Sequence, residues 1–173
     1  WVTGIPIMPQ FSAKYDREPC ASELGLDARK TTLLLMSGGA GLSGIESVAE
    51  RLLRLPFELQ IIALCGRNRE LLDKLTELAI SHPQRLYPLG FTNSIERVMS
   101  CADLAITKPG GLTVSECLAM ALPILVVSPI PGQEERNADY LMEQGVALKA
   151  HDLAGLEFKA HFLLSNPHQL KAM

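Results

Sequence analysis

Glycine clusters give this chain its clearest sign of ligand chemistry. Residues 37–44 (SGGAGLSG) and 107–111 (TKPGG) each follow an apolar run and precede a helical pattern. Glycine lets the backbone approach a ligand closely, and the helix that follows offers unpaired N–H groups and a positive dipole end. Phosphate is the natural partner of such a turn. Both segments are therefore candidates for a phosphate site, and in the second one Gly110 and Gly111 leave room for a diphosphate.

The first glycine segment also fits a dinucleotide fingerprint. Residues 39–44 match GxGxxG, which in NAD-binding folds is followed about 20 residues later by an acidic residue that binds the ribose. The corresponding residues 65–69 (CGRNR) carry no carboxylate, although Arg67 and Arg69 suit a ribose 2′-phosphate. An NADP-dependent oxidoreductase is therefore one hypothesis. The other is that these glycines only form a tight turn.

The second glycine segment continues into a helical pattern, residues 108–116 (KPGGLTVSE). The N–H groups of residues 111–113 are placed to bind a diphosphate, and the Thr113 hydroxyl adds a donor. Glu116 lies one turn into the helix, and its carboxylate can accept two hydrogen bonds, which suits the vicinal hydroxyls of a ribose. The spacing of Thr113 and Glu116 equally fits a capping box. The residues alone leave both interpretations open.

Amide and acidic side chains follow the fifth apolar run, in residues 129–138 (PIPGQEERNA). Acidic residues in the first turn of a helix usually interact with the helix dipole. A second interpretation is that Gln133 and Glu134 face the same crevice as the glycine segments. A neutral amide beside a carboxylate binds neutral polyols well and repels phosphate, so this pair favours a sugar.

Alternating strand and helix patterns decide where these residues lie. Apolar runs predict six strands, at residues 31–36, 59–64, 85–89, 102–106, 124–127 and 146–148. Helical patterns lie between them, and a weaker one covers residues 153–164. This alternation is typical of an α/β fold with a Rossmann-like doubly wound parallel sheet, of strand order 3-2-1-4-5-6. Ligands bind beyond strands 1 and 4 of that order, where both glycine segments lie.

Composition excludes several functional classes. The 173 residues are 47% hydrophobic and 20% charged with a net charge of −3, which excludes a disordered chain and a chain-wide basic surface for nucleic acid. No apolar run reaches the roughly 18 residues of a membrane-spanning helix. The cysteines form no CxxC pair and no metal motif with the histidines, so we expect reduced thiols, no metal site and a cytoplasmic protein. They are Cys20, Cys65, Cys101 and Cys117.

Residues 108–116, 119–124 (AMALPI) and 129–138 together resemble the carboxyl-terminal, donor-binding half of family 28 glycosyltransferases. Within that family the nearest resemblance is to monogalactosyldiacylglycerol synthases and processive diacylglycerol glucosyltransferases. It extends from residues 4–7 (GIPI) to about residue 164. The resemblance implies a GT-B enzyme, in which two Rossmann-like halves enclose the active site. It implies inverting transfer of a hexose from a UDP-sugar to a lipid acceptor such as diacylglycerol, with no further cofactor.

The same resemblance implies roles for individual residues. Phe91 and Thr92 would hold uracil mainly through backbone groups, and Glu116 would bind the ribose hydroxyls. Gln133 and Glu134 would face the hexose, with Asn137 nearby. The full set of implied nucleotide contacts is Gly38, Gly39, Gly41, Phe91, Thr92, Gly110, Gly111, Leu112, Thr113 and Glu116.

The resemblance also divides the chain. We expect a lead-in and interdomain linker at residues 1–29, a UDP-sugar-binding domain at 30–165 and the start of a terminal helix at 166–173. The acceptor site, the membrane-facing surface and the catalytic base would lie in an amino-terminal half outside this chain, which is expected to be inactive alone. Met8 departs from the family pattern, because relatives often carry a basic residue there that reaches the nucleotide.

Two further hypotheses stay open. A UDP-sugar 2-epimerase shares the two-half fold, although it needs carboxylates and a histidine that this sequence does not place in the cleft. A nucleotide-binding or interaction module without catalysis would explain the same glycines. The residues are compatible with galactose, glucose or N-acetylglucosamine as the hexose.

Overall fold

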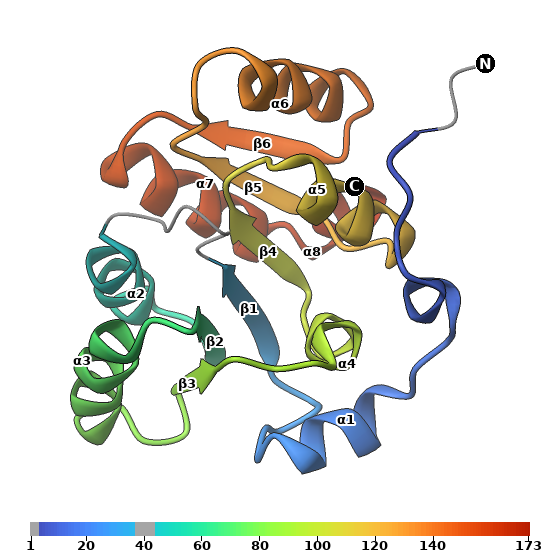
Figure 1. Ribbon diagram of the computed structural model, residues 1–173. Helices are drawn as coiled ribbons and strands as arrows, with labels where there is room; N and C mark the ends of the chain where they lie inside the picture. Colours follow the sequence, from blue (N-terminus) through green and yellow to red (C-terminus); the bar gives the residue numbers. More distant parts are fainter. Residues whose placement is uncertain (1–3, 37–43) are drawn as a thin grey trace.

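One parallel sheet of six strands forms the centre of the molecule. The computed structural model describes residues 4–36 and 44–173, and its strand order is β3-β2-β1-β4-β5-β6 (Figure 1). This is the order predicted from the sequence, and the Rossmann-like fold is confirmed. The strands are β1 (Thr31–Met36), β2 (Leu59–Gly66), β3 (Leu86–Gly90), β4 (Leu104–Thr107), β5 (Ile124–Val127) and β6 (Ala147–Ala150).

Helices cover both faces of the sheet, which gives three layers (Figure 1). One face carries α2 (Ile45–Leu53), α3 (Arg69–Ile80), α7 (Leu153–Ser165) and α8 (Pro167–Ala172). The other face carries a 3-10 turn, η1 (Pro9–Ser12), with α1 (Arg17–Glu23), α4 (Ile95–Ser100), α5 (Gly111–Ala119) and α6 (Gln133–Glu143). None of the helices in the described part of the chain is long and apolar enough to cross a membrane.

The alternation of side chains along β1 explains why the sheet is buried on both sides. Successive residues of a strand point to opposite faces. Leu33 and Leu35 therefore pack with the core under α2 and α3, whereas Leu34 and Met36 pack with the core under α4 and α5. A strand that is apolar on both faces reads as a continuous apolar run, which is the pattern of this segment.

The segment expected as a lead-in and linker is more structured than that expectation. It contains α1, a seven-residue helix that begins at Arg17. Phe11 of η1 and Cys20 of α1 are buried in the core under α4 and α5. Short elements of this kind gain their stability from tertiary burial, so local sequence patterns reveal them poorly.

Candidate functional site

The start of α5 leaves a row of backbone donors without partners. Gly110 precedes the helix in an extended conformation, with no side-chain cap, and the first helical bond runs from Val114 N–H to the Gly110 carbonyl at 2.9 Å. The N–H groups of Gly111, Leu112 and Thr113 therefore have no acceptor among the described residues. Free N–H groups at the positive end of a helix dipole bind anions.

Gly110 and Gly111 have different surroundings. Neither has a positive φ, so backbone conformation does not require glycine at either position. A Cβ on Gly111 would lie 2.6 Å from Cδ1 of Ile5, the end of an exposed side chain, and 3.7 Å from Nε2 of Gln133. A Cβ on Gly110 would meet nothing closer than Glu134 Oε1 at 3.9 Å, so the described residues leave space beside Gly110.

Glu116 has a carboxylate that is without a partner among residues 4–36 and 44–173. It lies in α5, half-buried, and its side chain makes no hydrogen bond or ion pair with the part of the chain that the structure describes. Burial raises the pKa of this carboxyl above its ordinary value. The capping-box interpretation is wrong, because the helix is preceded by Gly110 and Thr113 is already its third residue. Glu116 is left free to accept hydrogen bonds from a ligand.

The start of α6 lies beside the start of α5. Gly132 has a φ of 100°, a conformation that glycine adopts without strain, and it brings the chain into α6. Glu134 accepts a hydrogen bond from Ile130 N–H through Oε2 at 2.7 Å, while its Oε1 faces Gly110. The structure thus brings Gln133 and Glu134 next to Gly110 and Gly111. One of the two Glu134 carboxylate oxygens already accepts a hydrogen bond from the loop before α6.

Asn137 points at the loop before α5. Its Nδ2 donates a hydrogen bond of 2.8 Å to the carbonyl of Pro109. The side chain predicted to lie near a hexose is therefore already engaged with the backbone of the glycine turn. Sequence reasoning missed this contact, because the two residues are 28 positions apart and belong to different strand-to-helix units.

Phe91 and Thr92 follow β3. The Phe91 ring is exposed, and the guanidinium carbon of Arg67 lies 4.8 Å from its centroid. The Thr92 hydroxyl accepts a hydrogen bond from Ser94 N–H at 3.1 Å, so this side chain closes the turn into α4. Arg67 and Arg69 line a hollow with Phe91 at the ends of β2 and β3, so both arginines of the NADP hypothesis lie there.

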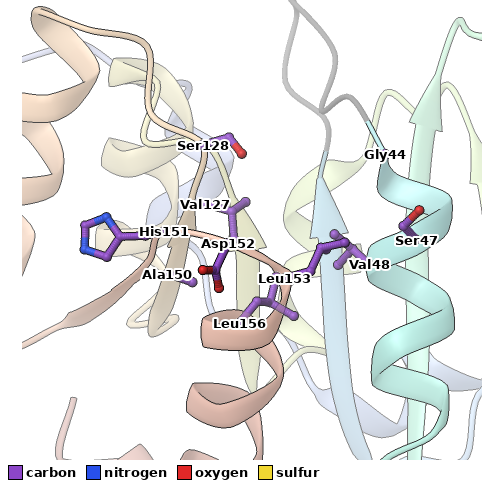
Figure 2. A pocket seen from close by; sticks show the side chains of 10 residues that line it. All are labelled: Gly44, Ser47, Val48, Val127, Ser128, Ala150, His151, Asp152, Leu153 and Leu156. Atoms are coloured by element: carbon purple, nitrogen blue, oxygen red, sulfur yellow. The ribbon is translucent and has the colours of Figure 1, made fainter.

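A separate pocket of about 190 Å³ lies on the α2 and α7 side of the sheet (Figure 2). Val48, Leu153 and Leu156 form its apolar wall, and the His151 ring points away from α2. Gly44, the last residue of the first glycine segment, lines this pocket, but none of the predicted nucleotide or sugar contacts in the described chain does. Gly38, Gly39 and Gly41, the predicted contacts of the first glycine segment, lie outside the described residues.

The sequence of residues 32–171 decides the family of this chain. Residues 32–171 match the glycosyltransferase family 28 C-terminal domain. The chain belongs to this family. Membership agrees with the resemblance carried by residues 108–116 and 129–138, and it replaces the oxidoreductase hypothesis.

Relatives and solved structures agree with this assignment. The processive diacylglycerol beta-glucosyltransferase of Bacillus pumilus is 36% identical over 173 residues, which is 99% of this chain and 45% of that protein. The family 28 chain thus spans less than half the length of this relative. WaaG, a glycosyltransferase of lipopolysaccharide biosynthesis, shares the fold with a TM-score of 0.75 at 17% identity, over 96% of this chain and 47% of that one. Anabaena HepE, solved in complex with UDP-glucose, shares the fold with a TM-score of 0.65 at 14% identity, over 95% of this chain and 46% of HepE.

Proposed function

We propose that this chain is the UDP-sugar-binding domain of an inverting hexosyltransferase that transfers a hexose to a lipid acceptor such as diacylglycerol. One observation carries the proposal: three free N–H groups at the start of α5 lie in the same helix as Glu116, a half-buried carboxylate without a partner among the described residues. The names of the relatives support the rest. The Bacillus pumilus relative is a diacylglycerol glucosyltransferase, and HepE was solved with UDP-glucose.

The proposed donor lies along the carboxyl edge of the sheet. The diphosphate binds at the N–H groups of residues 111–113, Glu116 accepts both ribose hydroxyls, and Gln133 and Glu134 face the hexose. In the complete enzyme a base deprotonates the acceptor hydroxyl, which attacks the anomeric carbon as UDP leaves. This chain contributes the dipole and the donors of α5, which stabilise the negative charge that develops on the departing diphosphate.

Glu116→Gln tests the ribose contact. An amide can accept at one oxygen only, and a hydrogen bond to a charged group contributes about 1.5–3 kcal/mol. UDP affinity, measured by calorimetry, should therefore fall by roughly 10- to 100-fold. The melting temperature should hardly change, because this carboxylate has no partner to lose in the described structure.

Two controls make the test specific. Glu143→Gln removes the same charge from the exposed last residue of α6 and should leave UDP affinity unchanged. 2′,3′-Dideoxy-UDP should bind the wild-type chain weakly and lose little more in Glu116→Gln. Equal wild-type affinity for UDP and its dideoxy analogue would contradict the ribose role of Glu116.

The transfer reaction itself is proposed for the complete enzyme. The 173-residue chain should bind UDP but transfer no glucose from UDP-glucose to diacylglycerol in mixed micelles, because the proposal places the base and the acceptor site in the other half. Product formation would be followed by thin-layer chromatography with radiolabelled donor. Hexosyl transfer by this chain alone would show that the acceptor machinery is present here.

A further inference from the structure

The peptide group between Pro109 and Gly110 is held at both ends. Asn137 Nδ2 donates to the Pro109 carbonyl at 2.8 Å, and Gly110 N–H donates to the Lys108 carbonyl at 2.9 Å. Gly110 has no side chain with which to fix its own conformation. The plane of this peptide group sets the direction in which the chain enters α5, so these two bonds determine where the helix start points.

The support for one of these bonds is rigid. Asn137 lies in α6, whose neighbouring residue Ala138 and whose Leu141 are fully buried in the core. The donor therefore sits on a helix that the core holds in place, whereas the acceptor belongs to a turn that begins with Pro109 and two glycines. The hydrogen bond from Asn137 therefore fixes the position of a glycine turn relative to the packed helix α6.

We propose that Asn137 is a positioning residue for the phosphate-binding turn: it holds the Pro109 carbonyl and thereby aims the N–H groups of Gly111, Leu112 and Thr113 at the diphosphate. This inference rests on the proposed function. It departs from the role that the family resemblance implied, in which Asn137 lies beside the hexose. The amide is needed because it donates: a carboxylate of the same size has no proton to give and repels the carbonyl.

The two roles predict different ligand profiles. Asn137→Asp and Asn137→Ala should weaken the binding of UDP and of UDP-glucose by the same factor, about tenfold or more, because the contacts that are misaligned belong to the diphosphate. Uridine, which has no phosphate, should bind both variants as it binds the wild-type chain. The measurement is calorimetry, or NMR titration for the weak uridine complex, with the full 173-residue chain.

Asn166→Asp is the matched control. Asn166 Nδ2 makes the same kind of bond, to the Phe162 carbonyl at 2.7 Å, between α7 and α8. This control should leave the affinities for all three ligands unchanged. In the ligand-free protein, the backbone amide signals of Gly110, Gly111 and Thr113 should shift in Asn137→Asp and stay in place in Asn166→Asp.

Each other outcome overturns the inference. A loss confined to UDP-glucose would make Asn137 a direct hexose contact, and unchanged affinity for all three ligands would mean that the bond positions nothing. An equal loss for uridine, with a lower melting temperature, would mean general destabilisation. If the wild-type chain binds no UDP, the proposed function is wrong, whatever Asn137 does. If the backbone amide signals of the turn do not shift in Asn137→Asp, the positioning role of Asn137 is wrong even when UDP binds.

Discussion

Two carboxylates at opposite edges of the sheet differ in their partners: Asp103 accepts three hydrogen bonds, whereas Glu116 has no partner among the described residues. At the amino edge, Asp103 accepts two bonds from Arg17, at 2.7 and 2.8 Å, and one from Thr32 N–H at 2.7 Å. Gln60 bonds to both backbone groups of Asp27 and to the Thr32 hydroxyl. Among the buried side-chain polar atoms of these described residues, Nε of Arg17 has no partner. At the carboxyl edge, the start of α5 and the Glu116 carboxylate have none among the described residues.

Three helices that begin at the carboxyl edge differ in whether a side chain caps them. The Asn68 side chain accepts Leu71 N–H at the start of α3, and the Asp152 side chain accepts Gly155 N–H at the start of α7. Gly110 offers no such group to α5. A buried polar group without a partner costs free energy. Helices α1, α2, α4 and α8 also begin without a side-chain cap bond, so a missing cap alone does not identify a binding site. The start of α5 differs in having Glu116 in the same helix, and we expect a ligand to complete both groups.

Gly110→Asp should produce the largest effect, because it gives α5 the cap that α3 already has. Gly110 has a φ of −64° and space for a Cβ, so the new carboxylate can accept the free N–H groups of the first turn. UDP affinity should fall at least about 100-fold, because the cap occupies the diphosphate donors and repels the diphosphate. The free energy of unfolding should change by only a few tenths of a kcal/mol. Calorimetry and urea unfolding measure the two quantities.

Asn68→Ala removes the side-chain cap of α3, which we expect to stabilise the fold and not to bind the ligand. It should cost about 1 kcal/mol of unfolding free energy and leave UDP affinity unchanged, since it removes a cap that lies outside the proposed donor contacts. Gly110→Ser separates capping from charge and should weaken UDP binding less than Gly110→Asp. Wild-type UDP affinity in Gly110→Asp would mean that the two kinds of helix start do not differ in function.

Asp103→Asn should weaken the amino edge without affecting the ligand. The substitution removes the charge that pairs with Arg17, and both side chains are about a third exposed, at 29% and 33%. Solvent screening limits the loss of unfolding free energy to about 1–2 kcal/mol. UDP affinity of the folded protein should stay the same. The exposed pair of Lys74 and Glu70 is the control, and Glu70→Gln should give no measurable change in stability. A large loss of UDP affinity in Asp103→Asn would couple the two edges.

The pH dependence of Glu116 is the smallest effect that we expect. Because burial raises its pKa in the folded state, the folded chain binds more protons than the unfolded chain between the two pKa values. Stability from this residue is therefore greatest below the ordinary pKa and falls as pH rises through the raised value. Glu116→Gln should lack that fall, so the two unfolding free energies should diverge as pH rises from the ordinary glutamate pKa of about 4.3 through the raised one.

Ligand binding should follow the opposite trend. The ionised carboxylate accepts both ribose hydroxyls, so uridine should bind the wild-type chain more weakly as pH falls below the raised pKa of Glu116. Uridine is the suitable probe because it lacks phosphates that titrate. A wild-type chain whose uridine affinity is as flat with pH as that of Glu116→Gln would argue against a charged ribose contact.

Local patterns in the sequence determined the architecture and the place of the site. Apolar runs of strand length predicted all six strands to within about two residues, and strand-helix alternation predicted their order, because right-handed crossovers leave few arrangements of a parallel sheet. In that strand order, the segment after β4 lies at the point between β1 and β4 where the order of the strands reverses and where ligands bind in such folds. Residues 108–116, 119–124 and 129–138 together then indicated the family, and the family match over residues 32–171 confirms it.

Only the tertiary structure decided how individual side chains are used. The spacing of Thr113 and Glu116 fits a capping box or a free carboxylate equally, and the choice depends on α5 beginning one residue after Gly110. Asn137 finds its acceptor 28 residues away, and the Ile5 side chain lies beside Gly111 although more than 100 residues separate them. Periodicity and spacing are properties of neighbours along the chain, whereas a hydrogen bond between two loops, or a side chain packed on a glycine, exists only once the sheet has brought distant segments together.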